Sequence, residues 1–335
     1  MRLLIVILSA LAACLGWSQE RIVIAYVTSW TDWVPDPQLM THINYAFGHV
    51  NDDFSSVRID KPDRLRQMVE LKQQKPDLKV LLSIGGWGSG NFSEMAANDQ
   101  FRSSFANDCK ALIEQYGLDG VDIDWEYPTS SLAGISCSPA DKDNFTLLMR
   151  DLRQAIGPDK LLTLASACTP QYIDFPAVMP YVDLVNVMAY DMGRAPSLHA
   201  GLHHSDNTLG MSADEAVEAH IKAGVPKHKL VMGMPFYGRG GEKYHDFEDF
   251  RATLEHTADS TANPRFTENW DAKAEVPYLT DDTGEIVFSY ENEKSIAAKC
   301  HYILSEGLRG GMYWSYGADS PNFPLAKTVA KILIK

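Results

Sequence analysis

Short apolar stretches alternate with amphipathic helical patterns along most of this chain of 335 residues. Eight of these stretches have the length and the β-branched or aromatic content of buried strands. They cover residues 22–26, 42–47, 80–84, 120–126, 161–167, 184–190, 230–235 and 311–314. Strand–helix alternation repeated eight times is typical of an α/β fold, the (β/α)8 TIM barrel. An open doubly wound sheet is the alternative fold, but the sequence favours it less because no glycine-rich phosphate fingerprint follows the first strand.

The helices between the strands are clearest over residues 99–116 and 141–156, where apolar side chains form one stripe at helical spacing. Residues 239–289 depart from this rhythm, with a helical pattern over 247–254 and a turn at 281–284. Some fifty residues are too many for a plain connection. We therefore predict a small insertion, about residues 240–289, between the seventh and eighth strands, and expect it to wall one side of the site.

The first 19 residues follow the plan of a secretory signal peptide, with an arginine, an apolar run and a polar end. The apolar run is too short to span a bilayer. We predict that residues 1–19 are removed and that residues 20–335 form one catalytic barrel, secreted or periplasmic. The alternative is a membrane-anchored lipoprotein, because residues 11–14 resemble a bacterial lipobox that ends at Cys14. Almost no tether would then remain before the first strand near Arg21.

The formal net charge of −14 and the sequence pI near 5.1 argue against a partner with a phosphate backbone. We therefore expect no nucleic-acid partner. A neutral or cationic substrate suits an acidic surface. We expect a monomer that contacts no membrane unless Cys14 is lipidated.

The fourth predicted strand carries three carboxyl side chains that alternate with apolar residues at 121, 123 and 125. Strand side chains alternate between faces, so Asp122, Asp124 and Glu126 project from the same side. Neighbouring members would lie about 6.5–7 Å apart along the strand, and each charge would raise the pKa of the next. Asp119 has the opposite parity, and we assign it a structural role.

Two chemical uses and one structural explanation fit this cluster. A carboxyl that stays protonated near neutral pH can act as a general acid. Three carboxylates can instead bind Mg²⁺ or Ca²⁺. A solvated charged face at a sheet edge is the structural explanation, but the strongly apolar opposite face argues against it.

In a barrel, the chemistry takes place where the strands end at their carboxyl side. Polar and aromatic residues gather at those ends here, with few lysines or arginines. Aromatic faces combined with carboxylates form suitable walls for sugar rings. The residues concerned are Tyr26, Trp30, Phe47, Gly86, Trp87, Glu126, Tyr190, Asp191, Tyr237, Arg239 and Trp314.

Several motifs resemble those of glycoside hydrolase family 18, the chitinases and endo-β-N-acetylglucosaminidases. Residues 119–126 resemble the family pattern DxxDxDxE, residues 83–86 its SxGG and residues 188–191 its MxYD. Residues 233–239 and 311–314 look like the chitinase-type members. The resemblance runs from about residue 21 to the end of the chain.

This resemblance implies a retaining mechanism in which the enzyme supplies no nucleophile. Glu126 would protonate the glycosidic oxygen, and the substrate's own 2-acetamido carbonyl would attack the anomeric carbon to give an oxazolinium ion. Asp124 would orient the acetamido N–H and share a proton with Asp122. Tyr190 would donate a hydrogen bond to the acetamido oxygen. Asp191 would help to bind the sugar and to tune the acid.

The implied activity is that of a chitinase acting on chitin or N-acetylglucosamine oligosaccharides, with no cofactor and no metal. Two alternatives stay open: an endo-β-N-acetylglucosaminidase acting on N-glycans, and a lectin that binds chitin without cleaving it. The retained Glu126 favours an enzyme over a lectin, and Trp314 and the insertion favour a chitinase. The resemblance and the strand ends together assign substrate binding to Tyr26, Phe47, Gly86, Trp87, Met188, Tyr237, Arg239 and Trp314.

Overall fold

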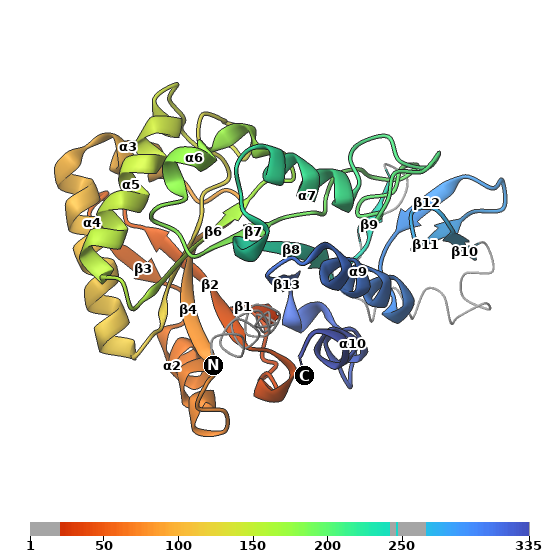
Figure 1. Ribbon diagram of the computed structural model, residues 1–335, viewed down its shortest axis with the longest axis horizontal. Coiled ribbons are helices and arrows are strands. Elements are labelled where there is room, and N and C mark those ends of the chain that lie inside the picture. The colour runs from red at the N-terminus through yellow and green to blue at the C-terminus, as the bar shows by residue number, and fades with distance from the viewer. Residues whose placement is uncertain (1–20, 242–245, 247–265, 335) are drawn as a thin grey trace, which may run out of the picture.

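The computed structural model describes residues 21–241, 246 and 266–334. Its centre is a closed barrel of parallel strands, each paired with the next and with the first strand bonded to both its neighbours (Figure 1). The strands are β1 (Ile22–Thr28), β2 (His42–Val50), β4 (Lys79–Gly85), β5 (Gly120–Asp124), β6 (Leu161–Ser166), β7 (Leu184–Val187), β8 (Leu230–Pro235) and β13 (Gly310–Trp314). All eight lie where the sequence predicts a strand, so the TIM-barrel prediction is confirmed.

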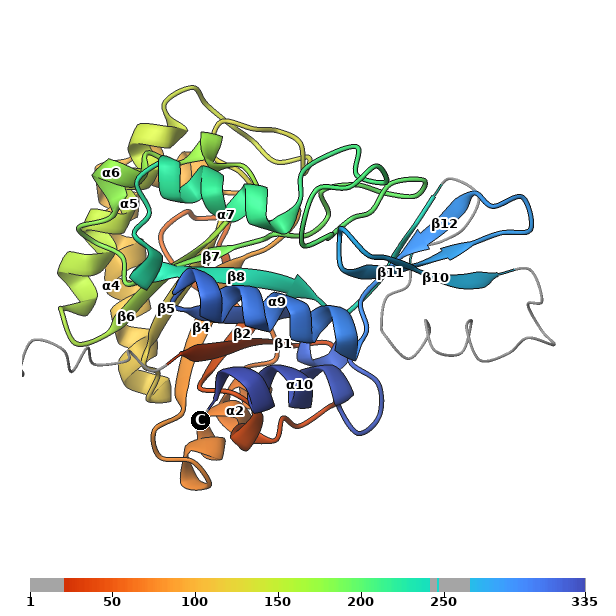
Figure 2. The same ribbon diagram turned by 45° about the vertical axis from the view of Figure 1, so that its right-hand side comes forward.

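Helices surround the barrel, as Figures 1 and 2 show. They are α2 (Pro62–Glu70), α3 (Phe92–Ala97), α4 (Asp99–Tyr116), α5 (Asp141–Ile156), α6 (Phe175–Val178), α7 (Ala213–Lys222), α9 (Glu293–Glu306) and α10 (Pro324–Leu333). Short 3-10 helices are η1 (Pro37–Leu39), η2 (Leu71–Gln73), η3 (Pro170–Tyr172), η4 (Lys227–Lys229) and η5 (Tyr316–Ala318). The predicted helices 99–116 and 141–156 begin and end at the predicted residues. Gly117 caps the carboxyl end of α4, and its left-handed φ of 70° suits a glycine.

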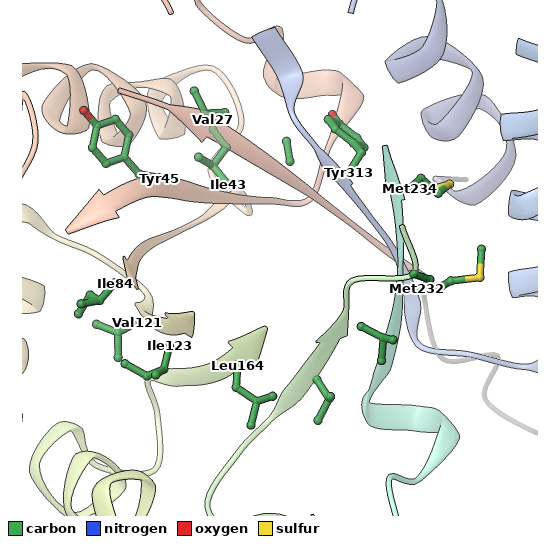
Figure 3. Close-up of a cluster of buried hydrophobic side chains, with 14 of the residues drawn as sticks. Val27, Ile43, Tyr45, Ile84, Val121, Ile123, Leu164, Met232, Met234 and Tyr313 are labelled. Atoms are coloured by element: carbon green, nitrogen blue, oxygen red, sulfur yellow. The ribbon is translucent and has the colours of Figure 1, made fainter. Parts of the chain in front are cut away.

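Strand residues alternate between two buried clusters. Val121 and Ile123 of β5 belong to the larger cluster, which fills the space between the barrel and its helices (Figure 3). The smaller cluster includes Ile24, Tyr26 and Met312. This alternation places the side chains of β5 with the other parity inside the barrel, where the chemistry takes place.

Two predicted strands run two or three residues past their observed carboxyl ends. Strand β5 ends at Asp124 rather than at residue 126, and β7 ends at Val187 rather than at residue 190. The carbonyl of Asp124 accepts a hydrogen bond from Gly86 N–H at 2.9 Å, and the chain beyond it forms a loop. Glu126 and Tyr190 are therefore loop residues, placed directly after strands.

The interval between β8 and β13 contains an antiparallel sheet that projects beside the barrel (Figures 1 and 2). Its strands are β9 (Arg239–Gly240), β10 (Thr267–Asp271), β11 (Val276–Thr280) and β12 (Ile286–Ser289). A further short strand, β3 (Val57–Ile59), pairs antiparallel with β2. An insertion between the seventh and eighth barrel strands is thus confirmed, and its predicted helical pattern at 247–254 lies outside the described residues.

The predicted signal peptide and Cys14 also lie outside the described part of the chain. Within that part, no helix combines the length and the apolar character needed to cross a membrane.

Candidate active site

A cleft of about 760 Å³ opens at the carboxyl ends of the barrel strands. Its lining combines aromatic rings with a few charged groups, as expected for a small-molecule site. The lining residues are Trp30, Phe47, Trp87, Glu126, Tyr127, Leu132, Ala167, Cys168, Thr169, Tyr172, Met188, Tyr190, Asp191, Gly193, Arg194, Tyr237, Arg239 and Trp314.

Asp122 lies beneath the cleft, fully buried in the barrel. Its Oδ2 accepts hydrogen bonds from the hydroxyls of Tyr26 and Ser83, both at 2.8 Å. Its Oδ1 accepts them from Thr163 Oγ1 at 2.6 Å and from Asn186 Nδ2 at 3.1 Å. Burial raises the pKa of Asp122, and these four bonds act in the opposite direction. Four donors on two oxygens also leave little room for a cation.

Asp124, the next carboxyl on this face, is 4% exposed, and its Oδ1 is buried without a hydrogen-bond partner. Burial and the charges of Glu126 and Asp122 raise its pKa well above the ordinary value. Among the described contacts, no hydrogen bond joins Asp122 to Asp124. The proton that the resemblance has them share stays a prediction.

Glu126 is the carboxyl of this series that reaches the cleft. Burial raises its pKa to about 7; a hydrogen bond from Tyr127 acts to lower it, and the charge of Asp191 raises it further. A carboxyl with this pKa is protonated in a large fraction of molecules at neutral pH. Glu126 therefore meets the requirement for a general acid.

Asp191 is held in the ionised form by Arg239. The guanidinium donates from Nε to Oδ1 at 2.6 Å and from Nη2 to Oδ2 at 2.7 Å. Burial acts to raise the pKa of Asp191, but the neighbouring His199 and the hydrogen bonds from Arg239 outweigh it and hold the pKa well below its usual range. Asp246, from the inserted segment, accepts hydrogen bonds from Arg239 at 3.1 Å and from Arg194 at 2.6 Å.

Tyr190 directly precedes Asp191 and lines the cleft. Burial and neighbouring groups, Tyr237 first among them, raise the pKa of its hydroxyl well above the ordinary value. The hydroxyl therefore stays protonated and can donate a hydrogen bond to a ligand. The Tyr237 ring packs edge-on against it, with 6.2 Å between the ring centroids.

The floor of the cleft is a cluster of rings around Trp314. Phe47 stacks on it at 5.5 Å between centroids, and Tyr26 and Trp30 lie at 5.6 and 6.2 Å. Gly86 makes room for this cluster, because a Cβ there would lie 2.6 Å from the Phe47 ring. Such a floor can stack against the C–H face of a sugar ring.

A second set of rings lines another part of the cleft. Tyr127 and Tyr172 stack with 4.8 Å between centroids, and Trp87 packs edge-on against Tyr127 at 6.4 Å. Trp87 is 62% exposed, so its ring is available to a ligand.

The structure brings most of the predicted site residues to one cleft: Glu126, Tyr190, Asp191, Phe47, Trp87, Met188, Tyr237, Arg239 and Trp314 all line it. Asp122, Asp124, Tyr26 and Gly86 lie behind the lining and support it. Among the described residues of the predicted insertion, 240–289, none lines the cleft, so the expected wall is not confirmed; Arg239, in the first strand of the inserted sheet, does line it. Sequence reasoning missed Tyr127, Leu132, Tyr172 and Arg194; only Tyr127, beside the acidic motif, carried a usable signal.

Asp119 has the structural surroundings that its parity predicts. Its carboxylate accepts a hydrogen bond from Val80 N–H at 2.8 Å and pairs with Lys72. Across the described ranges, no three histidine, cysteine, aspartate or glutamate side chains are grouped as metal ligands.

Residues 22–319 match the family profile described as glycosyl hydrolases family 18. The chain belongs to this family. Family 18 relatives of known structure include an N-acetylglucosaminidase from Paenibacillus barengoltzii, 34% identical with a TM-score of 0.83, in a comparison that covers 94% of this chain and 100% of that one. The Group IV chitinase of Ostrinia furnacalis in complex with allosamidin is 29% identical with a TM-score of 0.81, covering 94% and 99%.

Relatives known by sequence carry chitinase names. Chitinase A1 of Niallia circulans is 30% identical over 85% of this chain and 53% of its own length. Probable chitinase 2 of Drosophila melanogaster is also 30% identical, over 93% of this chain and 75% of its own. This family 18 chain thus spans about half the length of the Niallia relative.

Proposed function

We propose that this chain hydrolyses β-1,4 bonds in chitin or N-acetylglucosamine oligomers, with retained anomeric configuration and with Glu126 as the acid and base. The observation that carries the proposal is the pairing of a cleft-lining Glu126, with a pKa of about 7, with a buried Asp124 whose Oδ1 has no partner. The chitinase names of the relatives support the choice of substrate class.

In the first step, protonated Glu126 gives its proton to the glycosidic oxygen as the bond from that oxygen to the anomeric carbon breaks. A retaining enzyme then needs a nucleophile on the opposite face. Neither nearby carboxylate is suited to this role, because Asp124 is 4% exposed and Asp191 is bound by Arg239 through both oxygens. The substrate's own acetamido oxygen is the remaining nucleophile, and its attack gives an oxazolinium ion.

Two groups suit the acetamido substituent of the reacting sugar. The partnerless Oδ1 of Asp124 can accept a hydrogen bond from the acetamido N–H, which satisfies a buried acceptor. The protonated Tyr190 hydroxyl can donate to the acetamido oxygen. In the second step, ionised Glu126 takes a proton from water as the water oxygen attacks the anomeric carbon, which opens the oxazolinium ring.

The test is product analysis by mass spectrometry with N-acetylglucosamine hexamer and, in parallel, a high-mannose glycopeptide. We expect short oligomers from the hexamer only, and none from a Glu126→Gln variant, which should still bind the hexamer. Cleavage of the glycopeptide alone would replace this proposal with the endo-β-N-acetylglucosaminidase. Binding of the hexamer without cleavage by the wild type would replace it with the lectin.

We also propose that the chain acts outside the cytoplasm, on the basis of the signal-like residues 1–19. Labelling with a radioactive fatty acid precursor in a bacterial host would reveal anchoring through Cys14. N-terminal sequencing of secreted protein that begins near residue 20 would support cleavage of the signal.

A further inference from the structure

His199 is a buried titratable side chain that the proposed mechanism leaves unused. It is 0% exposed, and neither of its ring nitrogens has a hydrogen-bond partner. By contrast, the equally buried His220 bonds to Ser166 Oγ at 2.9 Å and to the carbonyl of Ala216 at 2.7 Å. A buried polar group without a partner costs about 1–3 kcal/mol, so its presence beside an active site calls for an explanation.

The ring of His199 lies directly beside the catalytic cleft. Its Nδ1 is 3.5 Å from Asp191 Oδ1, at the outer limit of a hydrogen bond. Its other neighbour in the site is Tyr237, with 5.5 Å between the ring centroids. The ring nitrogen that faces Asp191 is therefore already aimed at the carboxylate.

The main chain of His199 is hydrogen-bonded both to the loop that carries Asp191 and to the inserted sheet. Its carbonyl accepts a hydrogen bond at 3.0 Å from the N–H of Met192, the residue after Asp191. Its own N–H donates to Ser289 Oγ at 3.0 Å. Asp191 has a positive φ of 55°, a conformation that the tight loop around it must maintain.

These contacts form a closed circuit between the barrel and the inserted sheet. Ser289 of β12 is the cross-strand partner of Arg239 in β9. Arg239 binds both oxygens of Asp191, and Asp191 faces His199, which returns to Ser289. The inserted sheet thus reaches the cleft carboxylate along two routes: the Arg239 guanidinium binds it, and the His199 imidazole faces it without a hydrogen bond.

We propose that His199 is a positioning residue for Asp191: when sugar fills the cleft, His199 Nδ1–H donates to Asp191 and holds its carboxylate beside Glu126. This inference rests on the proposed function. Hydrogen bonds in empty active sites are often long and tighten in the complex. A movement of well under 1 Å brings the 3.5 Å contact into the usual range of about 2.7–3.2 Å.

The kinetic test compares His199→Leu, which has no donor, with His199→Asn, whose amide can donate from nearly the position of Nδ1. Misplacement of a group near the reacting atoms by about 1 Å can cost about 10²-fold. We expect His199→Leu to lower kcat on the hexamer by about tenfold to a hundredfold, with KM much less affected, and His199→Asn to recover most of the loss. His220→Leu is the matched control, and it should lower the melting temperature while leaving kcat unchanged.

A His199→Leu variant that keeps the kcat of the wild type would overturn the inference, as would a His199→Asn variant as slow as His199→Leu. A wild type that cleaves no hexamer would instead refute the proposed function itself.

A crystal structure of Glu126→Gln with bound hexamer gives a second readout that does not depend on turnover or on the folding of a His199 variant. We expect the Nδ1 to Oδ1 distance to shorten to about 2.7–3.2 Å. A distance that stays at 3.5 Å or grows would overturn the role of His199.

Discussion

Each carboxylate of the site has its own protonation state, set by its immediate surroundings. Asp191 is ionised because Arg239 binds both of its oxygens. Glu126 has no such cation in the described structure, and its pKa rises to about 7, with burial as the largest cause. One fold thereby provides a fixed negative charge and a proton donor in the same cleft, which is the division of roles that acid catalysis needs.

The pH dependence of the reaction follows from these states. Glu126 must be protonated to act as an acid, so kcat/KM should fall as the pH rises above about 7. Asp191→Asn removes a negative charge that raises the pKa of Glu126, so this basic limb should move to lower pH. Asp63→Asn, the same charge change on an exposed side chain of α2, is the control. A basic limb at the same pH in both variants would show that Asp191 does not raise the pKa of Glu126.

The raised pKa of Glu126 also predicts a stability cost. In the folded protein Glu126 has a pKa of about 7, against an ordinary value of 4.5. Its contribution to folding stability is therefore fully present below pH of about 4.5 and is lost as the pH rises through about 7. Glu126→Gln removes this cost, on the order of 3 kcal/mol at alkaline pH from about 1.4 kcal/mol per pKa unit. We expect the melting temperature of Glu126→Gln to exceed that of the wild type at pH of about 8, and the difference to be much smaller at pH of about 5. The same difference at both values would contradict the assignment.

The sequence identified the residues whose positions a strand dictates. Parity alone put Asp122 and Asp124 on one face of β5, and strand ends pointed to Tyr190 and Trp314. Arg194 and His199 could not be found in this way, because they lie in a loop without periodicity. Their roles come from contacts with residues such as Asp246 and Asp191 that no local pattern encodes.

At the scale of elements, close approach of two strand ends builds the site. Gly85, the last residue of β4, has a φ of 127°, and a Cβ there would lie 2.0 Å from the carbonyl oxygen of Asp124. Gly86 N–H then bonds to that carbonyl. Gly85 is therefore explained by the backbone packing that places Asp124, and Gly86 by the room that the Phe47 ring needs. The predicted contact of Gly86 with substrate stays a prediction.

A buried ion pair ties the end of the inserted sheet to α9. Lys299 and Glu291 are 0% and 1% exposed and bond to each other, and Ser295 donates to the second oxygen of Glu291 at 2.6 Å. Lys299→Met leaves the buried Glu291 carboxylate without its cation and should lower the free energy of unfolding by about 3–5 kcal/mol. The double variant Lys299→Met/Glu291→Leu should cost far less than the two single changes together.

Urea unfolding of the four proteins in this cycle measures the coupling. The exposed pair Lys222 and Glu218 on α7 is the control, where Lys222→Met should change stability by less than about 0.5 kcal/mol. Additive effects of Lys299→Met and Glu291→Leu would show that the two charges do not depend on each other.

The strands of the inserted sheet were not predicted, whereas those of the barrel were. The barrel strands are almost wholly buried and rich in apolar residues, and therefore contrast with their surroundings. In β10, by contrast, Thr267 and Glu268 are exposed and only Asp271 is buried. A strand this polar does not differ from a loop in composition, and its pairing with β11 depends on the tertiary structure.

At the scale of the whole molecule, the formal net charge of −14 distinguishes between neutral and cationic sugars. N-acetylglucosamine hexamer carries no charge, so its affinity for Glu126→Gln should change little between about 0.05 and about 0.5 M salt. Glucosamine hexamer, with its amines protonated, should be attracted by the negative field, and salt should weaken its binding. Calorimetric titration of both sugars at the two salt concentrations measures the contrast.

The same pair of sugars separates attraction from catalysis. Glucosamine hexamer lacks the acetamido oxygen that serves as the nucleophile, so tighter binding at low salt should bring no cleavage by the wild type. If it is cleaved as fast as the acetylated hexamer, some group other than the substrate's acetamido oxygen must attack the anomeric carbon. If that group is Asp124, its carboxylate must leave its buried position, and Asp124→Asn would then abolish cleavage of both sugars rather than only of the acetylated one.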